Sequence, residues 1–397
     1  MSSKIHLPHF KNCTGCMACH DTCKQNAIVI NKNNRGFYQI DIDYTKCIQC
    51  KKCEKVCPVI NPPTIENYTP NAYIGWSLSN NNLLRSASGG IFIELALSFI
   101  KIYQHSIVYG AVWNQETEQL SHKFARTSDE IIQFQNSKYL QSNVSNTYTQ
   151  VKQHLQESNK VLFSGTPCQI GGLLNFLPKK LHKNLYTIEI ICHGVPSFDV
   201  LNASKNFYKA SQIVSFRTKK DGWELSQKCT YRSYDKELLT PNKGSDVFYN
   251  MFLSEYFLRP ACMHCPFAKL PRIADITLGD YWGDNKIKNK LGTSLFFINN
   301  SRALDFISTA NIFKKEINFI ESLHISSRMT CNLYSHLKII PRFLWVSAFI
   351  KGKKRNLFYK IYFKIWNKLI QKAQKRKKNI ITKAILEYEN YRNHNNS

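Results

Sequence analysis

The sequence predicts a chain of three parts: a small α+β module, a larger α/β domain with a mostly parallel or mixed sheet, and a basic helical tail. Eight of the 14 cysteines fall before residue 60, in two copies of one spacing. Strand-like and helix-like segments alternate between residues 161 and 209, which is typical of a parallel sheet. After residue 350 the chain becomes strongly basic. The expected parts are residues 1–68, 70–335 and 340–397.

The composition narrows the class of protein. The chain has 397 residues, of which 43% are hydrophobic and 13% aromatic, so it can fill a proper core and is not a low-complexity chain. Its first residues lack the apolar core of a signal peptide, and its apolar stretches are shorter than a membrane span. We therefore expect a cytoplasmic protein, whose clustered cysteines bind metal instead of forming disulfides.

The cysteines of the first part follow the spacing C-x2-C-x2-C-x3-C twice. Three thiolates two residues apart can hold three corners of one [4Fe–4S] cluster, and the fourth then ligates the other cluster. This predicts a ferredoxin-like module with two clusters, in which segments 27–30 and 38–42 form short strands. A pair of zinc sites is the alternative, although zinc favours two C-x2-C halves with a longer spacer. The expected ligands are Cys13, Cys16, Cys19 and Cys57 for the first cluster, and Cys47, Cys50, Cys53 and Cys23 for the second.

The second part contains two strand–turn–helix units. Segments 161–163 and 186–191 are expected to be neighbouring strands of a parallel sheet, followed by helices at 169–177 and 198–209. In such sheets, ligands gather where the strands end at their carboxyl side.

A cysteine follows each of these strands, and a C-x2-C pair lies further along the chain. Four thiolates brought to one sheet edge are enough for a third [4Fe–4S] cluster. Tetrahedral zinc and ordinary buried cysteines are the alternatives. The expected ligands are Cys168, Cys192, Cys262 and Cys265, whereas Cys229 and Cys331 are expected to be small core residues.

Seven short motifs follow one another in the second part: SGG (88–90), SKYLQS (137–142), GTPCQIGGL (165–173), CHGVPS (192–197), FRTKKDGW (216–223), RPACMHCPF (259–267) and DITLGDYWG (275–283). In this order they resemble the coenzyme F420 hydrogenase/dehydrogenase beta-subunit family, and the resemblance covers about residues 1–285. It implies a flavin, FAD or FMN, that converts one-electron transfer through clusters into two-electron or hydride transfer. The four later cysteines are similar to that family's additional cluster.

The resemblance leaves the electron acceptor open. Deazaflavin, coenzyme F420, is the family's best-known acceptor. Similar bacterial proteins often accompany surface-polysaccharide biosynthesis, so an activated sugar or a lipid-linked glycan is an alternative substrate by association. The competing hypothesis is a non-catalytic subunit that carries electrons to a partner enzyme.

No G-x-G-x-x-G follows a strand, so we do not expect the flavin to bind in the usual dinucleotide manner. Amides that open the helix at 91–100 are expected to hold its phosphate, although a plain helix start would use the same glycines. His193 is expected to relay a proton or to make a structural hydrogen bond. Five further charged residues in the motifs could bind an anion or form ion pairs: Arg217, Lys219, Arg272, Asp275 and Asp280. The candidate cofactor-binding residues are Ser88, Gly89, Gly90, Lys138, Gly165, Thr166 and Gln169.

The third part predicts a basic amphipathic helix. Residues 351–383 carry 13 Lys or Arg and no Asp or Glu, nearly half of the chain's net charge of +27. Apolar residues recur there at helical spacing, with a lysine at every fourth position from Lys360 to Lys372. Such a helix suits the surface of an anionic inner membrane, or it packs on its parent domain. No recognised nucleic-acid-binding fold or motif accompanies the charge.

Overall fold

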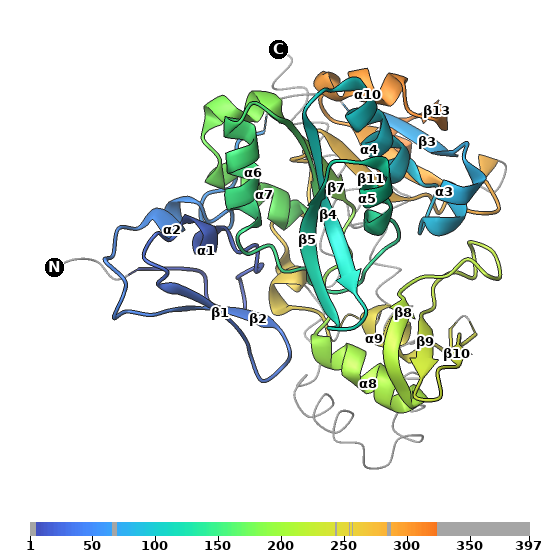
Figure 1. Cartoon of the computed structure of the whole chain (residues 1–397), viewed down its shortest axis with the longest axis horizontal. Coiled ribbons are helices and arrows are strands. Elements are labelled where there is room, and N and C mark those ends of the chain that lie inside the picture. Colours follow the sequence, from blue (N-terminus) through green and yellow to red (C-terminus); the bar gives the residue numbers. More distant parts are fainter. Residues whose placement is uncertain are drawn as a thin grey trace.

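The computed structural model shows a small module that lies against one side of a larger α/β domain (Figure 1). The expected tail at 340–397 and Cys331 lie outside the described residues, so the proposed membrane contact stays a prediction. In the part of the chain that is described, no helix is long and apolar enough to cross a bilayer. The structure describes residues 5–65, 70–242, 244–253, 255, 257–283 and 287–323.

The module is built from one hairpin and two short helices. Strands β1 (Ile28–Lys32) and β2 (Tyr38–Ile42) pair antiparallel, as the sequence predicts. Helices α1 (Ala18–Thr22) and α2 (Lys52–Lys55) each begin inside one of the two cysteine motifs. The module therefore has the α+β form expected of a ferredoxin-like domain.

The larger domain is organised around one eight-stranded mixed sheet. Its four central strands are parallel and its outer pairs are antiparallel, which confirms the expected mixed sheet. The expected neighbours are adjacent parallel strands, β6 and β7, and most of their residues are buried. In sheet order the strands are β13 (Ile312–Ile317), β3 (Asn71–Ser77), β12 (Ser294–Ile298), β11 (Ile276–Asp280), β7 (Leu185–Ile190), β6 (Lys160–Gly165), β4 (Ser106–Asn114) and β5 (Gln119–Ala125).

Helices cover both faces of this sheet (Figure 1). Alternate residues of β6 point to opposite faces: Leu162 packs in the core under α4 and α10, whereas Val161 and Phe163 pack in the core under α6 and α7. The helical segments are α3 (Asn80–Arg85), α4 (Ile91–Ile102), α5 (Ser128–Ile131), η1 (Ile132–Phe134), α6 (Thr147–Gln156), α7 (Pro167–Phe176), η2 (Lys179–Asn184), η5 (Ser301–Ala303), α10 (Leu304–Ser308) and α11 (Phe319–Leu323).

The expected helix after β7 forms, but it does not cover the large sheet. Helix α8 (Phe198–Tyr208) packs instead on β8, β9 and α9, because its buried side chains face that small subdomain. Its expected place as a sheet-covering crossover was therefore wrong. The chain returns to the large sheet at β11, after the short helix η3 (Pro260–His264). The subdomain contains β8 (Ala210–Ser215), β9 (Thr230–Ser233), β10 (Leu238–Leu239) and α9 (Val247–Leu253).

Candidate redox site

The first set of module cysteines gathers where the module meets the larger domain. Burial, together with the neighbouring Cys57 and Cys13, raises the pKa of the Cys16 thiol to about 12. Burial likewise raises the pKa of Cys19, which also feels the other three thiols. These four side chains, the expected ligands of the first cluster, therefore lie close together. A free thiolate is disfavoured there, and a bound cation would offset that cost.

The second set lies at the other end of the module. One small cavity is lined by all four of its cysteines, Cys23, Cys47, Cys50 and Cys53. Burial raises the pKa of Cys53 to about 11, whereas Cys50 is exposed to solvent. The structure thus brings together the four residues expected to hold the second cluster.

The two cysteine loops share one backbone conformation. Gly15 and Gln49, which occupy equivalent places, have φ angles of 70° and 55°. Met17 and Lys51, again equivalent, have φ angles of 62° and 57°. Non-glycine residues rarely adopt this left-handed region, so its recurrence at matching positions indicates a true structural repeat.

The third set assembles at the carboxyl edge of the large sheet. Cys168 follows β6 in the first turn of α7, and Cys192 follows β7. Cys262 and Cys265 arrive with η3, and all four cysteines line one cavity. Burial raises the pKa of the Cys262 thiol to about 12. The sheet topology therefore brings together the four residues that the sequence analysis grouped.

The cysteine sets match the donor requirement of iron–sulfur clusters. Among the residues described, no group of three or more His, Cys, Asp or Glu side chains is arranged to hold a metal ion. A [4Fe–4S] cluster uses a separate iron for each thiolate, so its ligands surround a volume instead of converging on one ion. Each of the three sets supplies the four thiolates that such a cluster needs.

A buried arginine joins the first cysteine loop to the segment before the third set. The Arg259 side chain is fully buried, and its Nε donates to the carbonyl oxygen of Cys13 at 2.6 Å. Its Nη1 donates to Tyr38 O at 2.7 Å and to Gln141 Oε1 at 3.2 Å. The Gln141 amide in turn donates to Gly15 O at 2.9 Å. The module is therefore held to the larger domain by hydrogen bonds to its own cysteine loop.

Helix α6 makes a second attachment. The Asp21 carboxylate accepts hydrogen bonds from the backbone N–H groups of Asn146, Tyr148 and Thr149, at 2.6, 2.9 and 3.2 Å. These donors open α6, where a carboxylate is favoured by the unpaired N–H groups and by the helix dipole. The Tyr148 hydroxyl lies 2.8 Å from the carbonyl oxygen of Cys16. The same loop that carries the first cysteines thus caps a helix of the larger domain.

Two glycines of α7 allow close contact, Gly172 with the first cysteine loop and Gly171 with the loop of the third set. A Cβ atom on Gly172 would lie 3.1 Å from Cys16 Sγ, and one on Gly171 would lie 2.9 Å from the ring of Phe267. The Cys16 thiol is close enough to Cys168 to raise the pKa of the Cys168 thiol. The first and third cysteine sets therefore both contact helix α7.

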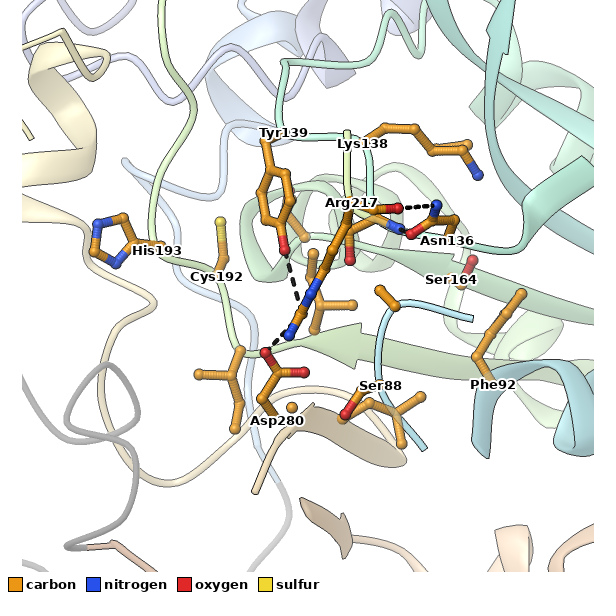
Figure 2. Close-up of a pocket in the computed structure, with 18 of the residues that line it drawn as sticks. Ser88, Phe92, Asn136, Lys138, Tyr139, Ser164, Cys192, His193, Arg217 and Asp280 are labelled. Carbon is orange, nitrogen blue, oxygen red and sulfur yellow. Dashed lines mark hydrogen bonds and ion pairs between the residues drawn. The ribbon is translucent and has the colours of Figure 1, made fainter. Parts of the chain in front are cut away.

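A larger pocket adjoins the third set (Figure 2). Its volume is about 430 Å³, within the range of small-molecule sites, and its wall is mostly apolar. Thr166, Gln169, Ser142 and Cys192 line both this pocket and the cavity of the third cysteine set. The pocket wall includes seven of the eight residues expected to bind a cofactor or relay a proton: Ser88, Gly90, Lys138, Gly165, Thr166, Gln169 and His193.

The SGG motif opens α4, but its middle glycine serves packing. The Gly89 amide donates to Ser294 Oγ at 2.9 Å, and a Cβ atom there would lie 2.4 Å from Gly75 O. Gly89 does not line the pocket, so the expectation that its amide binds phosphate was wrong. Gly90, with φ 76°, is the N-cap of α4 and does reach the pocket wall.

The expected phosphate contact of Lys138 is also wrong. Its Nζ donates to the carbonyl oxygens of Gln133, Phe134 and Gln135, at 3.2, 2.9 and 2.7 Å. These three bonds use the full donor capacity of an ammonium group. Burial lowers the pKa of Lys138 to about 7. Figure 2 shows its amino group on the side away from Arg217, where it holds the end of η1.

Thr166 and Gln169 shape the wall between the two cavities. They form a capping box at the start of α7, in which the Thr166 amide donates to Gln169 Oε1 at 3.0 Å. The Gln169 amide nitrogen donates to Ser142 Oγ at 2.9 Å, and Thr166 Oγ1 lies 3.2 Å from Cys168 Sγ. Their side chains therefore fix the wall, and a bound molecule would meet a rigid surface.

His193 lies at the edge of the pocket (Figure 2). Its Nε2 is 3.2 Å from Glu255 Oε1, and its ring packs edge-on against Phe252. This ion pair fits the structural alternative as well as the proton relay, so the catalytic role stays a prediction.

Arg217, which the sequence analysis left outside its site candidates, occupies the centre of the pocket (Figure 2). Its side chain is buried, and Nη1 donates to Asp280 Oδ2 at 2.8 Å while Nε donates to Ser226 Oγ at 2.9 Å. Among the described residues, its Nη2 has no hydrogen-bond partner. Trp223 and Trp282 stack on each other at 4.6 Å beside it. The sequence does place these four residues in two motifs: Arg217 and Trp223 lie in FRTKKDGW, and Asp280 and Trp282 lie in GDYWG.

The remaining charged candidates form internal contacts. Arg272 pairs with buried Glu189 and donates to Phe267 O at 3.0 Å, so it holds the loop that follows the third set. Asp275 pairs with Arg302 at 2.7 Å. Lys219 donates to the carbonyl oxygens of Leu83 and Ser88, both at 2.6 Å. Cys229 is fully buried, as expected of a core residue.

Two segments of the chain match known protein families. Residues 12–61 match the 4Fe-4S dicluster domain, and residues 158–319 match the family defined by the C-terminal part of the beta subunit of coenzyme F420 hydrogenase/dehydrogenase. An uncharacterized ferredoxin from Methanocaldococcus jannaschii is 35% identical over 49 residues, which are 12% of this chain and 61% of that ferredoxin.

One protein of the F420-reducing [NiFe] hydrogenase complex from Methanosarcina barkeri is similar in structure. The match has 16% sequence identity and a TM-score of 0.44, and it covers 73% of this chain and 89% of that one. A likeness at this level carries no inference about function. The chain thus combines a segment that matches the 4Fe-4S dicluster domain, at residues 12–61, with a segment that matches the C-terminal family of the coenzyme F420 hydrogenase/dehydrogenase beta subunit, at residues 158–319.

Proposed function

We propose that the chain is an iron–sulfur flavoprotein oxidoreductase that holds three [4Fe–4S] clusters and binds a flavin, FAD or FMN, in the pocket beside the third cysteine set. One observation carries the proposal: the pocket and the third cysteine cavity share a wall. A bound flavin would supply the exchange between one-electron and two-electron transfer. The organic acceptor is coenzyme F420 or another molecule that fits over the flavin.

The order of the cysteine sets supports this proposal. The second set reaches the solvent, the first set is buried against α7, and the third set lies between α7 and the pocket. Electrons that pass between neighbouring sets would therefore travel from the module surface towards the pocket, or the reverse way.

The residues around the pocket suit an anionic, planar molecule. Arg217 presents a buried guanidinium to the pocket, which can bind a phosphate or carboxylate group. Apolar side chains such as Phe92, Ile190 and Leu278 provide flat contact area and exclude water. Thr166 and Gln169 would contact the edge of the bound molecule nearest the third set.

The test is anaerobic reconstitution of the full chain, followed by mass spectrometry of the extracted organic cofactor. We expect FAD or FMN at about one per chain. An Arg217→Met variant should keep its iron and bind the flavin at least tenfold more weakly, because it loses a charge-assisted hydrogen bond. Lys220→Met, an exposed neighbour in the same motif, is the matched control and should bind flavin normally.

The competing function, an electron carrier without a substrate of its own, makes the opposite prediction. Protein that contains its full iron but no organic cofactor, even after incubation with FAD and FMN, would contradict the enzyme proposal. A flavin that bleaches with dithionite and is reoxidised by coenzyme F420 would identify the acceptor.

A further inference from the structure

We propose that the loop of the second cysteine set, residues 48–52, is the docking surface for an acidic one-electron carrier protein. The proposal rests on the proposed function only in requiring that the module carries its clusters. It names the partner's chemistry and the face that receives it.

The first repeat shows what this loop conformation does when it is docked. Thr14 is 6% exposed and Ala18 is fully buried, because this face of the first loop packs against the larger domain. Cys16, Met17 and Ala18 belong to the same hydrophobic core as residues of α6 and α7. In this repeat, the residues between the cysteines therefore serve as an interface.

The second repeat presents the equivalent face to solvent. Ile48, which corresponds to Thr14, is 66% exposed, and Lys52, which corresponds to Ala18, is exposed as well. Cys50 is exposed, whereas its counterpart Cys16 is buried. An apolar side chain next to an accessible cluster ligand is the arrangement expected where a redox partner must approach closely.

The charge around the loop favours a partner with an acidic surface. The two carboxylates in its rim are already engaged: Asp43 pairs with Lys46 at 3.1 Å, and Glu54 accepts a hydrogen bond from the amide of His6. Five lysines outnumber these two carboxylates in the rim, so the rim presents a net positive field, which attracts an acidic protein surface and speeds its association. The lysines of the rim are Lys24, Lys46, Lys51, Lys52 and Lys55.

The experiment measures binding of flavodoxin, an acidic one-electron carrier, to the anaerobically reconstituted full chain. We expect Lys51→Glu/Lys52→Glu to raise the dissociation constant at least tenfold at low salt, since it reverses charge at the contact. Lys314→Glu/Lys315→Glu makes the same charge change on exposed residues of β13, at the far edge of the large sheet (Figure 1). This control should change the dissociation constant by less than twofold.

Electron transfer supplies an independent readout. The double variant should slow reduction of the clusters by reduced flavodoxin at least tenfold, while reduction by the methyl viologen radical, a small cation, should not slow. Ile48→Ser should weaken flavodoxin binding while leaving its salt dependence unchanged. Iron content and thermal unfolding, measured on each variant, confirm that the module is intact.

Equal flavodoxin binding by the unaltered protein and the double variant would overturn the proposal, as would an equal loss in the β13 control. Binding of the unaltered protein that does not weaken between low and high salt would overturn it too. These outcomes do not depend on the flavin of this chain. Protein that lacks flavin but binds flavodoxin through this loop would contradict the proposed enzyme and support the docking surface.

Discussion

The two cysteine repeats have the same spacing and the same backbone, yet their surroundings are opposite. In the first repeat, Met17 is 1% exposed and sits in the core shared with the larger domain. In the second repeat, the equivalent position is Lys51, which reaches the surface. The cysteines set the shape of each loop, and the residues between them decide what the loop touches.

Because of this difference, the two ends of the module meet different surroundings. The buried repeat contacts α7 and lies near Cys168, while the exposed repeat presents Cys50 to solvent. Under the proposed function, one module would exchange electrons with a partner at one end and with its own larger domain at the other. Three substitutions, two of them with a matched control in the exposed repeat, test whether the asymmetry arises from the contacts described above.

The largest effect is expected from Gly172→Leu. Its side chain would enter the space of Cys16 Sγ, which lies 3.1 Å from where even a Cβ atom would be. Overpacking of this kind costs about 3 kcal/mol, and here it would force the module away from α7. Thermal unfolding and iron content measure the loss. Lys52→Leu adds the same side chain to the exposed repeat and should leave both unchanged; equal losses in the two variants would contradict the asymmetry.

Arg259→Met should have the next largest effect. It removes the bonds to Cys13 O, Tyr38 O and Gln141 Oε1, and it leaves these buried acceptors with fewer partners. We expect a loss of about 2–3 kcal/mol in the free energy of unfolding, measured with denaturant. Arg259→Lys should not restore it, because an ammonium cannot reproduce the guanidinium fork. Full stability in the methionine variant would show that docking does not depend on this residue.

The smallest effect is expected from Asp21→Asn. The change keeps the shape of the helix cap but removes its charge, which should cost about 1 kcal/mol at the start of α6. The equivalent residue of the exposed repeat is Lys55, and Lys55→Gln should have no measurable effect on stability. A difference of less than about 0.3 kcal/mol between the two variants would mean that the charge of the cap contributes nothing to docking.

The sequence predicted the parts of this arrangement that follow from local periodicity and spacing. The module hairpin, the neighbouring strands β6 and β7, and the grouping of four distant cysteines at one edge are all present in the structure. Spacing alone could not distinguish the environments of the two repeats, since burial is decided by residues more than 100 positions away, such as Gln141 and Arg259.

The wrong expectations share a physical cause. Gly89 and Lys138 have the chemistry of phosphate binding, but tertiary contacts with Ser294 and with the end of η1 use their donors. Helix α8 was expected on the large sheet because it follows β7. It packs instead on β8, β9 and α9, which a local sequence pattern does not reveal. Arg217 was named only as one of five charged residues that could bind an anion or form ion pairs, because a sequence does not show which of several cations faces a pocket.

Iron and acid-labile sulfide analysis of anaerobically prepared protein tests the proposed electron path most directly. That path needs a third cluster, because the third cysteine set lies between the buried repeat and the pocket. The unaltered chain should contain about twelve of each per molecule, counting four per cluster, and Cys168→Ser should contain about eight. About eight in the unaltered chain, or an unchanged value in the variant, would contradict the proposed sequence of three clusters.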